Sequence, residues 1–402
     1  LALQGTNVQA GMLLDTITVN ARGSVSNLRL DAQAKNELGA VALEGGATDL
    51  ATSGTLTLGN VAGDSLEARA GGAMGQVAGT ALMIDNATSL VAGNDIYLGN
   101  VANVFGGTVA LSGVNASIRT ASPLAFSSID AASIVATAPR LQLPTLVNTT
   151  GLQFYDGAVW LAGDTRLVSR IGQINFQGSI DGAHALTVEP AVNAVFNGNV
   201  GATAALASLD VQGFTRLGGS VTTSGSQSYQ DPTVLTGNSR LTSTGGGSIA
   251  FGSTVDGPHS LTVDTSGSAV FSGNIGGSVA LAGLAVDAGT FTSGGALSVQ
   301  GDLSLATRAG AIVQSGAWTA GGDSAFAADG DIVLTNVGND FASRVDLSGE
   351  NIAISDSNSL TLDSLAVGTL TASSMGALNL GHGSVAANLA ATRGGGRATQ
   401  PG

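Results

Sequence analysis

The chain has 402 residues, of which 43% are hydrophobic and only 10% charged, and its net charge is −14 at pH 7 with a pI near 4.3. Binding to nucleic acid or to an anionic membrane surface is disfavoured, because both need clustered cations and the chain has only 14 lysines and arginines, which form no cluster. Cysteine is absent, which excludes disulfides, thiolate metal sites and cysteine nucleophiles.

Short strands separated by turns are the predicted elements along the whole chain. Glycine contributes 60 residues and proline only 7, and Gly, Asn, Asp or Ser bounds each apolar run. Such runs are typical of β-strands, and they are too short and too many for helices that cross between parallel strands. No run is long enough for a membrane-spanning helix. In chain order, clear runs are Thr55–Leu58, Asp95–Leu98, Ala185–Val188, Ser260–Val263, Asp331–Leu334 and Ser359–Leu362.

Internal repetition is the strongest pattern in the sequence. Residues 174–211 align without gaps on residues 249–286, with 19 of 38 positions identical at an offset of 75. Residues 95–118 align on residues 331–354, with 13 of 24 positions identical at an offset of 236. Together with the uniform composition, these repeats predict one long repetitive body.

Large apolar residues recur every 20 residues inside the longer repeat, which suits one coil of a β-helix. The two offsets are then about four and about twelve coils of roughly 19 to 20 residues. One coil of three short strands cannot bury its inward face alone, but stacked coils can, with strands of successive coils paired at about 4.8 Å.

We therefore predict an all-β protein, a right-handed parallel β-helix with coils of about 20 residues. It is expected to run as one continuous solenoid over 1–390, followed by a flexible Gly-rich tail at 391–402. An array of small β-sandwiches is the alternative, but sandwiches need repeats of about 90 to 100 residues. The side chains predicted to stack inside the helix are Phe176, Phe196, Phe251, Phe271 and Phe291.

Two stretches resemble the repeats of filamentous-haemagglutinin-type exoproteins, the large adhesins of Gram-negative two-partner secretion systems. The first is 311–341, AIVQSGAWTAGGDSAFAADGDIVLTNVGNDF, followed by VDLSG at 345–349. The second is the 75-residue unit, with LTSTGGGSIAF at 241–251 and a Val-Asp-Gly turn at 255–257. With the copy at 95–118, the resemblance covers about two thirds of the chain.

The resemblance implies a secreted, surface-displayed adhesin shaft, exported through a partner outer-membrane β-barrel transporter and located outside a Gram-negative cell. Its receptor, a host glycan or protein, is not identified by the sequence. An autotransporter passenger has the same fold and a similar composition, so that export route stays open. The family's secretion domain is not recognisable in Leu1–Leu50, and we expect the chain to be an internal or processed segment.

Catalytic signatures are missing from the sequence. The only lysine, Lys35, is followed by Asn36, so no phosphate-binding Gly-Lys-Ser/Thr loop exists, and no Gly-x-Ser-x-Gly or Gly-x-Gly-x-x-Gly occurs. His382, in Gly-His-Gly, resembles one signature of β-helical polygalacturonases, but their paired carboxylate motifs are absent. We predict no catalytic, cofactor-binding or metal-ligating residue and no cofactor; a β-helical polysaccharide lyase or hydrolase is the alternative.

The remaining polar motifs are interpreted as parts of turns. His184 and His259 occupy equivalent repeat positions, and about four coils of separation, about 19 Å, would prevent them from sharing a metal. Acidic turns such as 329–331 could bind Ca²⁺, but Asx side chains commonly satisfy turn amides. Glycosylation sequons begin at Asn86, Asn115 and Asn148, a pattern that often arises by chance in such a composition. Trp160 and Trp318 are expected in the core or at a coil cap.

Overall fold

A computed structural model of the protein describes residues 7–10, 20–21, 27–31 and 38–394, with side chains from residue 46 onward. Every regular element in these ranges is a β-strand, and the predicted all-β parallel β-helix with coils of about 20 residues is confirmed. The described part contains no helix that could span a membrane.

The chain divides into two compact units, one made of Leu1–His184 with Val188–Asn193 and the other of Ala185–Thr187 with Ala194–Gly402. Strand β18 (Ala185–Pro190) is shared between them. Each unit is built as a solenoid, and continuity over 1–390 stays a prediction. Strand β41 extends to Arg393, and the rest of the predicted tail, 395–402, lies outside the described residues.

The strands of the first unit are β1 (Asn7–Ala10), β2 (Asn20–Ala21), β3 (Asn27–Asp31), β4 (Leu38–Thr52), β5 (Leu56–Ala70), β6 (Met74–Gln76), β7 (Leu82–Ile84), β8 (Thr88–Ala92), β9 (Ile96–Leu98), β10 (Val104–Phe105), β11 (Thr108–Arg119), β12 (Leu124–Gln142), β13 (Leu146–Thr149), β14 (Gln153–Trp160), β15 (Thr165–Ser169), β16 (Ile174–Phe176) and β17 (Ile180–Asp181).

The strands of the second unit are β19 (Ala194–Phe196), β20 (Ser208–Val211), β21 (Thr215–Leu217), β22 (Val221–Thr223), β23 (Gln227–Tyr229), β24 (Thr233–Leu235), β25 (Ser239–Ser243), β26 (Ile249–Phe251), β27 (Val255–Asp256), β28 (Ser260–Phe271), β29 (Gly283–Ser293), β30 (Leu297–Val299), β31 (Leu303–Thr307), β32 (Ile312–Val313), β33 (Trp318–Ala320), β34 (Ser324–Ala328), β35 (Ile332–Leu334), β36 (Asp340–Phe341), β37 (Arg344–Asp356), β38 (Leu360–Ser374), β39 (Leu378–Asn379), β40 (His382–Val385) and β41 (Leu389–Arg393).

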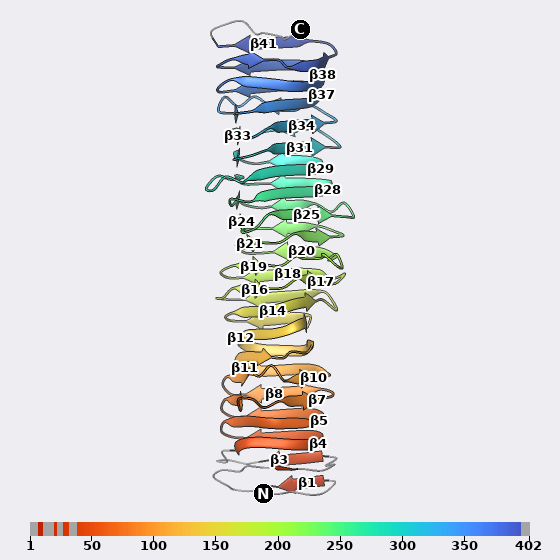
Figure 1. Ribbon diagram of the computed structural model, residues 1–402, viewed down its shortest axis with the longest axis vertical. Helices are drawn as coiled ribbons and strands as arrows, with labels where there is room; N and C mark the ends of the chain where they lie inside the picture. Colours follow the sequence, from red (N-terminus) through yellow and green to blue (C-terminus); the bar gives the residue numbers. More distant parts are fainter. Residues whose placement is uncertain (1–6, 11–19, 22–26, 32–37, 395–402) are drawn as a thin grey trace. The chain divides into compact units, whose positions relative to one another are not determined.

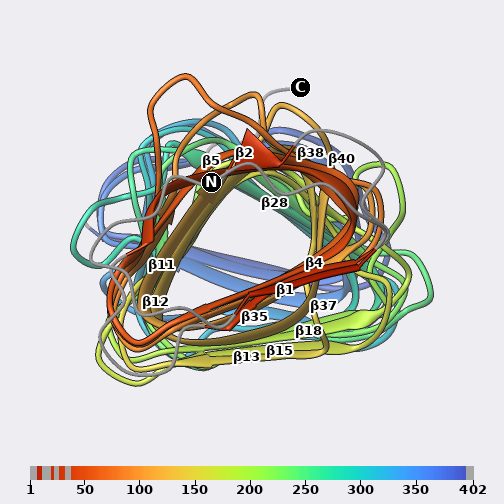
Figure 2. The same ribbon diagram turned by 90° about the horizontal axis from the view of Figure 1, so that it is seen from below.

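Strand pairs within each unit are parallel, and each strand lies beside its equivalent in the next coil. Figure 1 shows this stacking for β4 and β5 and for β37 and β38, whose residues are paired in register. Figure 2 looks along the coils and shows strands surrounding a common interior. Side chains alternate between that interior and solvent, so Leu261 and Val263 of β28 are buried while Thr262 between them is partly exposed.

Coil length varies, which the even 20-residue spacing did not predict. Phe251 pairs with Phe271 across 20 residues, but Leu261 pairs with Leu284 across 23. The pairing of β28 with β29 also shifts between Thr265 and Ser268, so Phe271 lies opposite Ser293 and not Phe291. Turns outside the strands absorb extra residues, whereas the inward and outward alternation must be kept within each strand.

Two equivalent turns of the 75-residue repeat require glycine. Gly182 and Gly257 both have φ of 128°. A Cβ atom would lie 2.4 Å from the carbonyl oxygen of Leu161 at the first turn and of Leu235 at the second. Only glycine tolerates both the backbone angle and this close approach to the preceding coil. The Asp-Gly motif in the repeat is therefore explained by coil stacking.

Candidate functional site

A column of aromatic rings fills the interior of the second unit. Tyr229, Phe251 and Phe271 stack with ring centroids 5.0 and 4.9 Å apart and with interplanar angles of 14° and 19°. Phe291 is tilted by 47° against Phe271 at 5.9 Å, which reflects the register shift. Stacked and offset rings of this kind stabilise a core beyond the area they bury.

Further rings extend the column toward the C-terminus. Trp318 lies 6.1 Å from both Phe291 and Phe326, and Phe326 lies 5.6 Å from Phe341. Trp318 is fully buried, so its predicted place in the core is confirmed. The predicted stack is thus buried at Phe251, Phe271 and Phe291, and it includes more rings than the spacing indicated. Phe196 is buried in the same unit, and Phe176 is buried in the first unit, 5.5 Å from Tyr155.

Buried glutamines hold the two tyrosines by an arrangement repeated at an offset of 74. The Tyr155 hydroxyl donates to Gln153 Oε1 at 3.0 Å, and the Tyr229 hydroxyl donates to Gln227 Oε1 at 3.2 Å. Each glutamine Nε2 in turn donates to a threonine hydroxyl and to backbone carbonyls. Burial raises the pKa of both phenols, so they stay neutral donors inside the coil.

A second buried polar arrangement, which we term the amide clasp, joins Gln76 to Asn103 and Gln314 to Asn339. In each clasp the two side-chain amides exchange reciprocal hydrogen bonds of 2.7–3.0 Å. The asparagine Oδ1 also accepts a backbone N–H, and its Nδ2 donates to two backbone carbonyls. Asn103 and Asn339 are 0% exposed, so every hydrogen-bonding group of these buried amides is satisfied. Sequence analysis assigned both asparagines to turns and missed the clasps.

Charged side chains form ladders on the outer surface. Arg344 lies between Asp323, at 2.9 Å, and Asp363, at 3.6 Å, on neighbouring coils. Asp363 also lies 3.4 Å from His382 Nδ1. Hydrogen bonds from the Ser343 hydroxyl, at 2.5 Å, and from Arg344 lower the pKa of Asp323 to about 2. Arg166 with Glu189 and Arg240 with Asp264 are equivalent exposed ion pairs in the two copies of the long repeat.

Acid should weaken the ladder at Asp323. Its pKa in the folded protein is lowered to about 2, below the ordinary value, so the ionised carboxylate favours folding above about pH 4 and this contribution is lost as pH falls toward 2. We expect Asp323→Asn to lower the melting temperature slightly at pH 6 and to differ less from the parent protein at pH 2. Thermal melts of both proteins at half-unit steps from pH 6 to 2 measure this difference.

Ser343→Ala should produce the same pattern more weakly, because it removes the strongest hydrogen bond to Asp323. Ser348→Ala is the matched control: Ser348 is exposed on the same strand and its hydroxyl has no partner among the described residues. A constant difference between Asp323→Asn and the parent at every pH would contradict the assignment.

The structure places the three histidines at separate turns. His184 and His259 directly precede β18 and β28, as predicted, and their N–H groups donate to the carbonyls of Gly182 and Gly257. His184 Nδ1 lies 3.7 Å from an exposed Asp164 carboxylate. Within the described residues no group of three His, Asp or Glu side chains could hold a metal ion. The acidic turn residue Asp331 accepts hydrogen bonds from Asn351.

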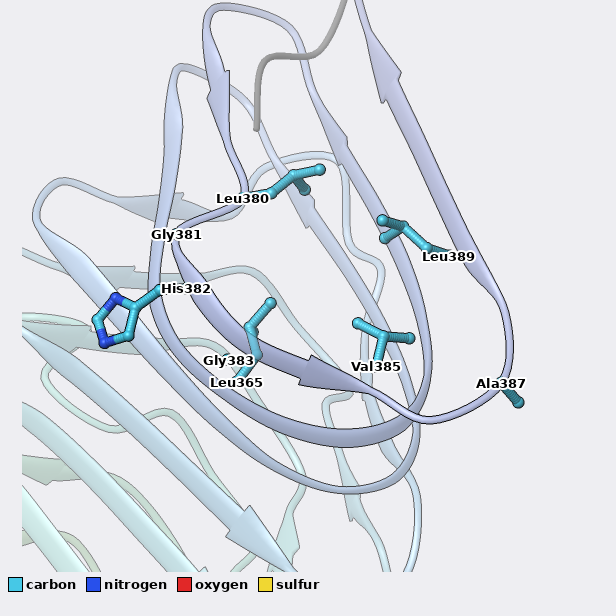
Figure 3. Close-up of a pocket in the computed structure, with 8 residues that line it drawn as sticks. All are labelled: Leu365, Leu380, Gly381, His382, Gly383, Val385, Ala387 and Leu389. Carbon is cyan, nitrogen blue, oxygen red and sulfur yellow. The ribbon is translucent and has the colours of Figure 1, made fainter. Parts of the chain in front are cut away.

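A recess of about 230 Å³ beside His382 is lined by residues of the last described coils. Figure 3 shows the His382 ring on the outer side of the coil, whereas Leu380 and Leu389 lie toward its inside. The other lining side chains are apolar or absent, and none is a carboxylate. His382 is thus brought together with Asp363, outside this recess, and the paired carboxylates needed for glycoside hydrolysis do not line it.

The three sequon asparagines, Asn86, Asn115 and Asn148, are all exposed. The amide of Asn115 donates to Asp95 at 2.8 Å and accepts from Ser133 at 2.6 Å, forming a ladder between coils. An equivalent ladder joins Asp331, Asn351 and Thr369 in the second copy of that repeat. Glycosylation stays a prediction, and at Asn115 it would compete with the ladder.

Both amide clasps fall in stretches that match known repeats. A family described as repeats of unknown function, DUF5649, matches residues 45–112 and 276–348, about a third of the chain. No curated protein and no solved structure matches the chain. The chain is therefore similar in these two stretches to repeats that carry no assigned function, and the resemblance to filamentous-haemagglutinin-type exoproteins stays a prediction.

Proposed function

We propose that this protein is a non-enzymatic β-helical shaft of a large secreted adhesin, displayed on the surface of a Gram-negative cell. The shaft extends and presents its outer turns to host cells or to neighbouring bacteria. Export through a partner outer-membrane β-barrel transporter is part of the proposal, as the resemblance to filamentous-haemagglutinin-type exoproteins implies. The receptor is a host glycan or protein whose identity the sequence does not specify.

The observation that carries this proposal is the interior of the second unit. Its aromatic column from Tyr229 to Phe341 stacks across successive coils, and the clasp at Asn339 ties neighbouring turns to the same interior. Stacked coils that contact mainly their neighbours resist bending as a packed core does, because buried side chains are as densely packed as organic crystals. Such a body suits mechanical extension.

Surface location is the first consequence to measure. Antibodies raised against the purified chain should label intact cells of the organism that makes it, and brief protease treatment of those cells should remove the label. A strain lacking the gene should attach less to host cells and aggregate less. Labelling that requires permeabilised cells would overturn the proposed location, and unchanged attachment and aggregation would overturn the adhesive role.

The enzyme alternative makes a different prediction. Purified protein should release no unsaturated or reducing ends from polygalacturonate or other uronate polymers, with or without Ca²⁺. Turnover that is lost in His382→Ala and in Asp363→Asn would favour a polysaccharide lyase or hydrolase and would overturn the shaft proposal.

A further inference from the structure

A second recess, of about 430 Å³, opens on the surface of the first unit where three coils meet. The turn at 105–108, the start of β12 and the end of β12 supply its walls. Phe105 and Leu124 are buried beneath it, and Pro123 and Thr108 are exposed at its edge. Its volume falls within the range of small-molecule sites, which is about 300–1,000 Å³.

Three polar side chains around this recess have no protein partner in the described part of the chain. The Arg140 guanidinium, the Gln142 amide and the Thr108 hydroxyl line the recess and make no side-chain hydrogen bond or ion pair there. This is unusual for the chain, because five other arginines pair with carboxylates. Unpaired polar groups that converge on a concave surface are the usual features of a binding site.

The aromatic ring of Trp160 holds Arg140 in place. The guanidinium carbon lies 4.6 Å from the centre of the Trp160 ring, a cation–π contact. Stacking occupies one face of the guanidinium but leaves the N–H groups in its plane unused. A planar fork of donors held in this way is suited to bind a carboxylate through two parallel hydrogen bonds.

A bulge in β12 places Arg140 at this point. The pairing of β12 with β14 shifts between Thr137 and Arg140, where Pro139 cannot donate a ladder hydrogen bond. Gly157 accommodates the bulge: its φ is 147°, and a Cβ atom there would lie 1.7 Å from the Ala138 carbonyl oxygen. Bulges of this kind redirect side chains and are common beside functional sites.

We propose that this recess binds an acidic sugar with a single carboxylate, such as a uronic acid residue at the end of a glycan. Arg140 would bind the carboxylate, and Gln142 and Thr108 would bind ring hydroxyls. A net charge of −14 repels polyanions at long range, which favours a ligand with one negative charge over a sulfated polymer. The inference deepens the proposed function by naming a ligand class, and binding is measured independently of surface display.

The test is titration of the purified chain with glucuronic acid, monitored by ligand-observed NMR, with glucose as the uncharged comparison. We expect saturable binding of glucuronic acid, little binding of glucose, and affinity lowered about 10- to 100-fold in Arg140→Gln, because a charge-assisted hydrogen bond is lost. Arg140→Lys should bind with intermediate affinity, since it keeps the charge without the planar fork. Ala125→Phe, which fills the recess from β12, should also abolish binding.

Arg216→Gln is the matched control, because Arg216 is an exposed arginine that has no carboxylate partner and lines no such recess. Binding that is unaffected by Arg140→Gln, or reduced equally by Arg216→Gln, would overturn the site. Acetate or a short peptide with a free C-terminus that binds as tightly as glucuronic acid would overturn the sugar assignment. Melting temperatures equal to that of the parent confirm that each variant is folded, and Arg140→Lys provides a second readout if Arg140→Gln is not.

Discussion

Phe271→Ala is expected to destabilise the coils around it by about 3–5 kcal/mol, because the fully buried ring leaves a cavity. The variant also loses the ring contacts with Phe251 at 4.9 Å and with Phe291 at 5.9 Å. Coils of a solenoid contact mainly their neighbours, so the effect should stay local. Hydrogen exchange with mass spectrometry should show faster exchange in β26, β28 and β29 and unchanged exchange in β37 and β38.

Val270→Ala is the matched control for this cavity, since Val270 precedes Phe271 on the same strand but is only partly buried. It removes apolar surface without opening the column, and we expect a much smaller change in exchange. Uniform acceleration throughout the second unit in Phe271→Ala would contradict a solenoid that transmits damage only to adjacent coils.

Asn339→Leu is expected to be as damaging as the loss of an aromatic ring, although leucine is apolar and of similar size. It removes the reciprocal bonds with Gln314 and leaves the Trp318 N–H and the carbonyls of Leu334 and Ser355 without these partners. Each buried group left unsatisfied costs about 1–3 kcal/mol. We therefore expect a total loss of about 3–6 kcal/mol, measured as local opening by hydrogen exchange at β33, β35 and β37.

Asn351→Ala provides the control, because that exposed amide hydrogen-bonds only on the surface and should change stability by about 0.5–1.5 kcal/mol. Asn103→Leu should reproduce the effect in the first unit, where the same clasp occurs. Equal protection in Asn339→Leu and Asn351→Ala would show that the clasp does not stabilise the coil.

Local patterns were sufficient to predict the strands and the inward direction of the phenylalanines. Alternation within a strand determines which side chains are buried, and Phe251 and Phe271 follow it directly. The register of Phe291 was not predictable, because it depends on extra residues in the β28–β29 bulge that leave the apolar alternation unchanged.

The polar core could be found only in part from the sequence. Asn103 and Asn339 stand at equivalent positions of a recognised repeat, which was a usable signal, but Gln76 and Gln314 lie outside the aligned segments. Turn residues and buried asparagines have the same composition, so burial had to be seen in the structure. The recess at Arg140 has no repeat equivalent, and it depends on the contact with Trp160, 20 residues later in the chain.

The placement of the two tryptophans gives each unit its own fluorescent reporter. Trp318 is the fully buried member of the aromatic column in the second unit, whereas Trp160 is partly exposed beside Arg140 in the first. The buried indole should emit at shorter wavelength than the partly exposed one. Emission from Trp160→Phe therefore reports the second unit alone and that from Trp318→Phe the first, so the order in which the two unfold can be recorded without any added dye.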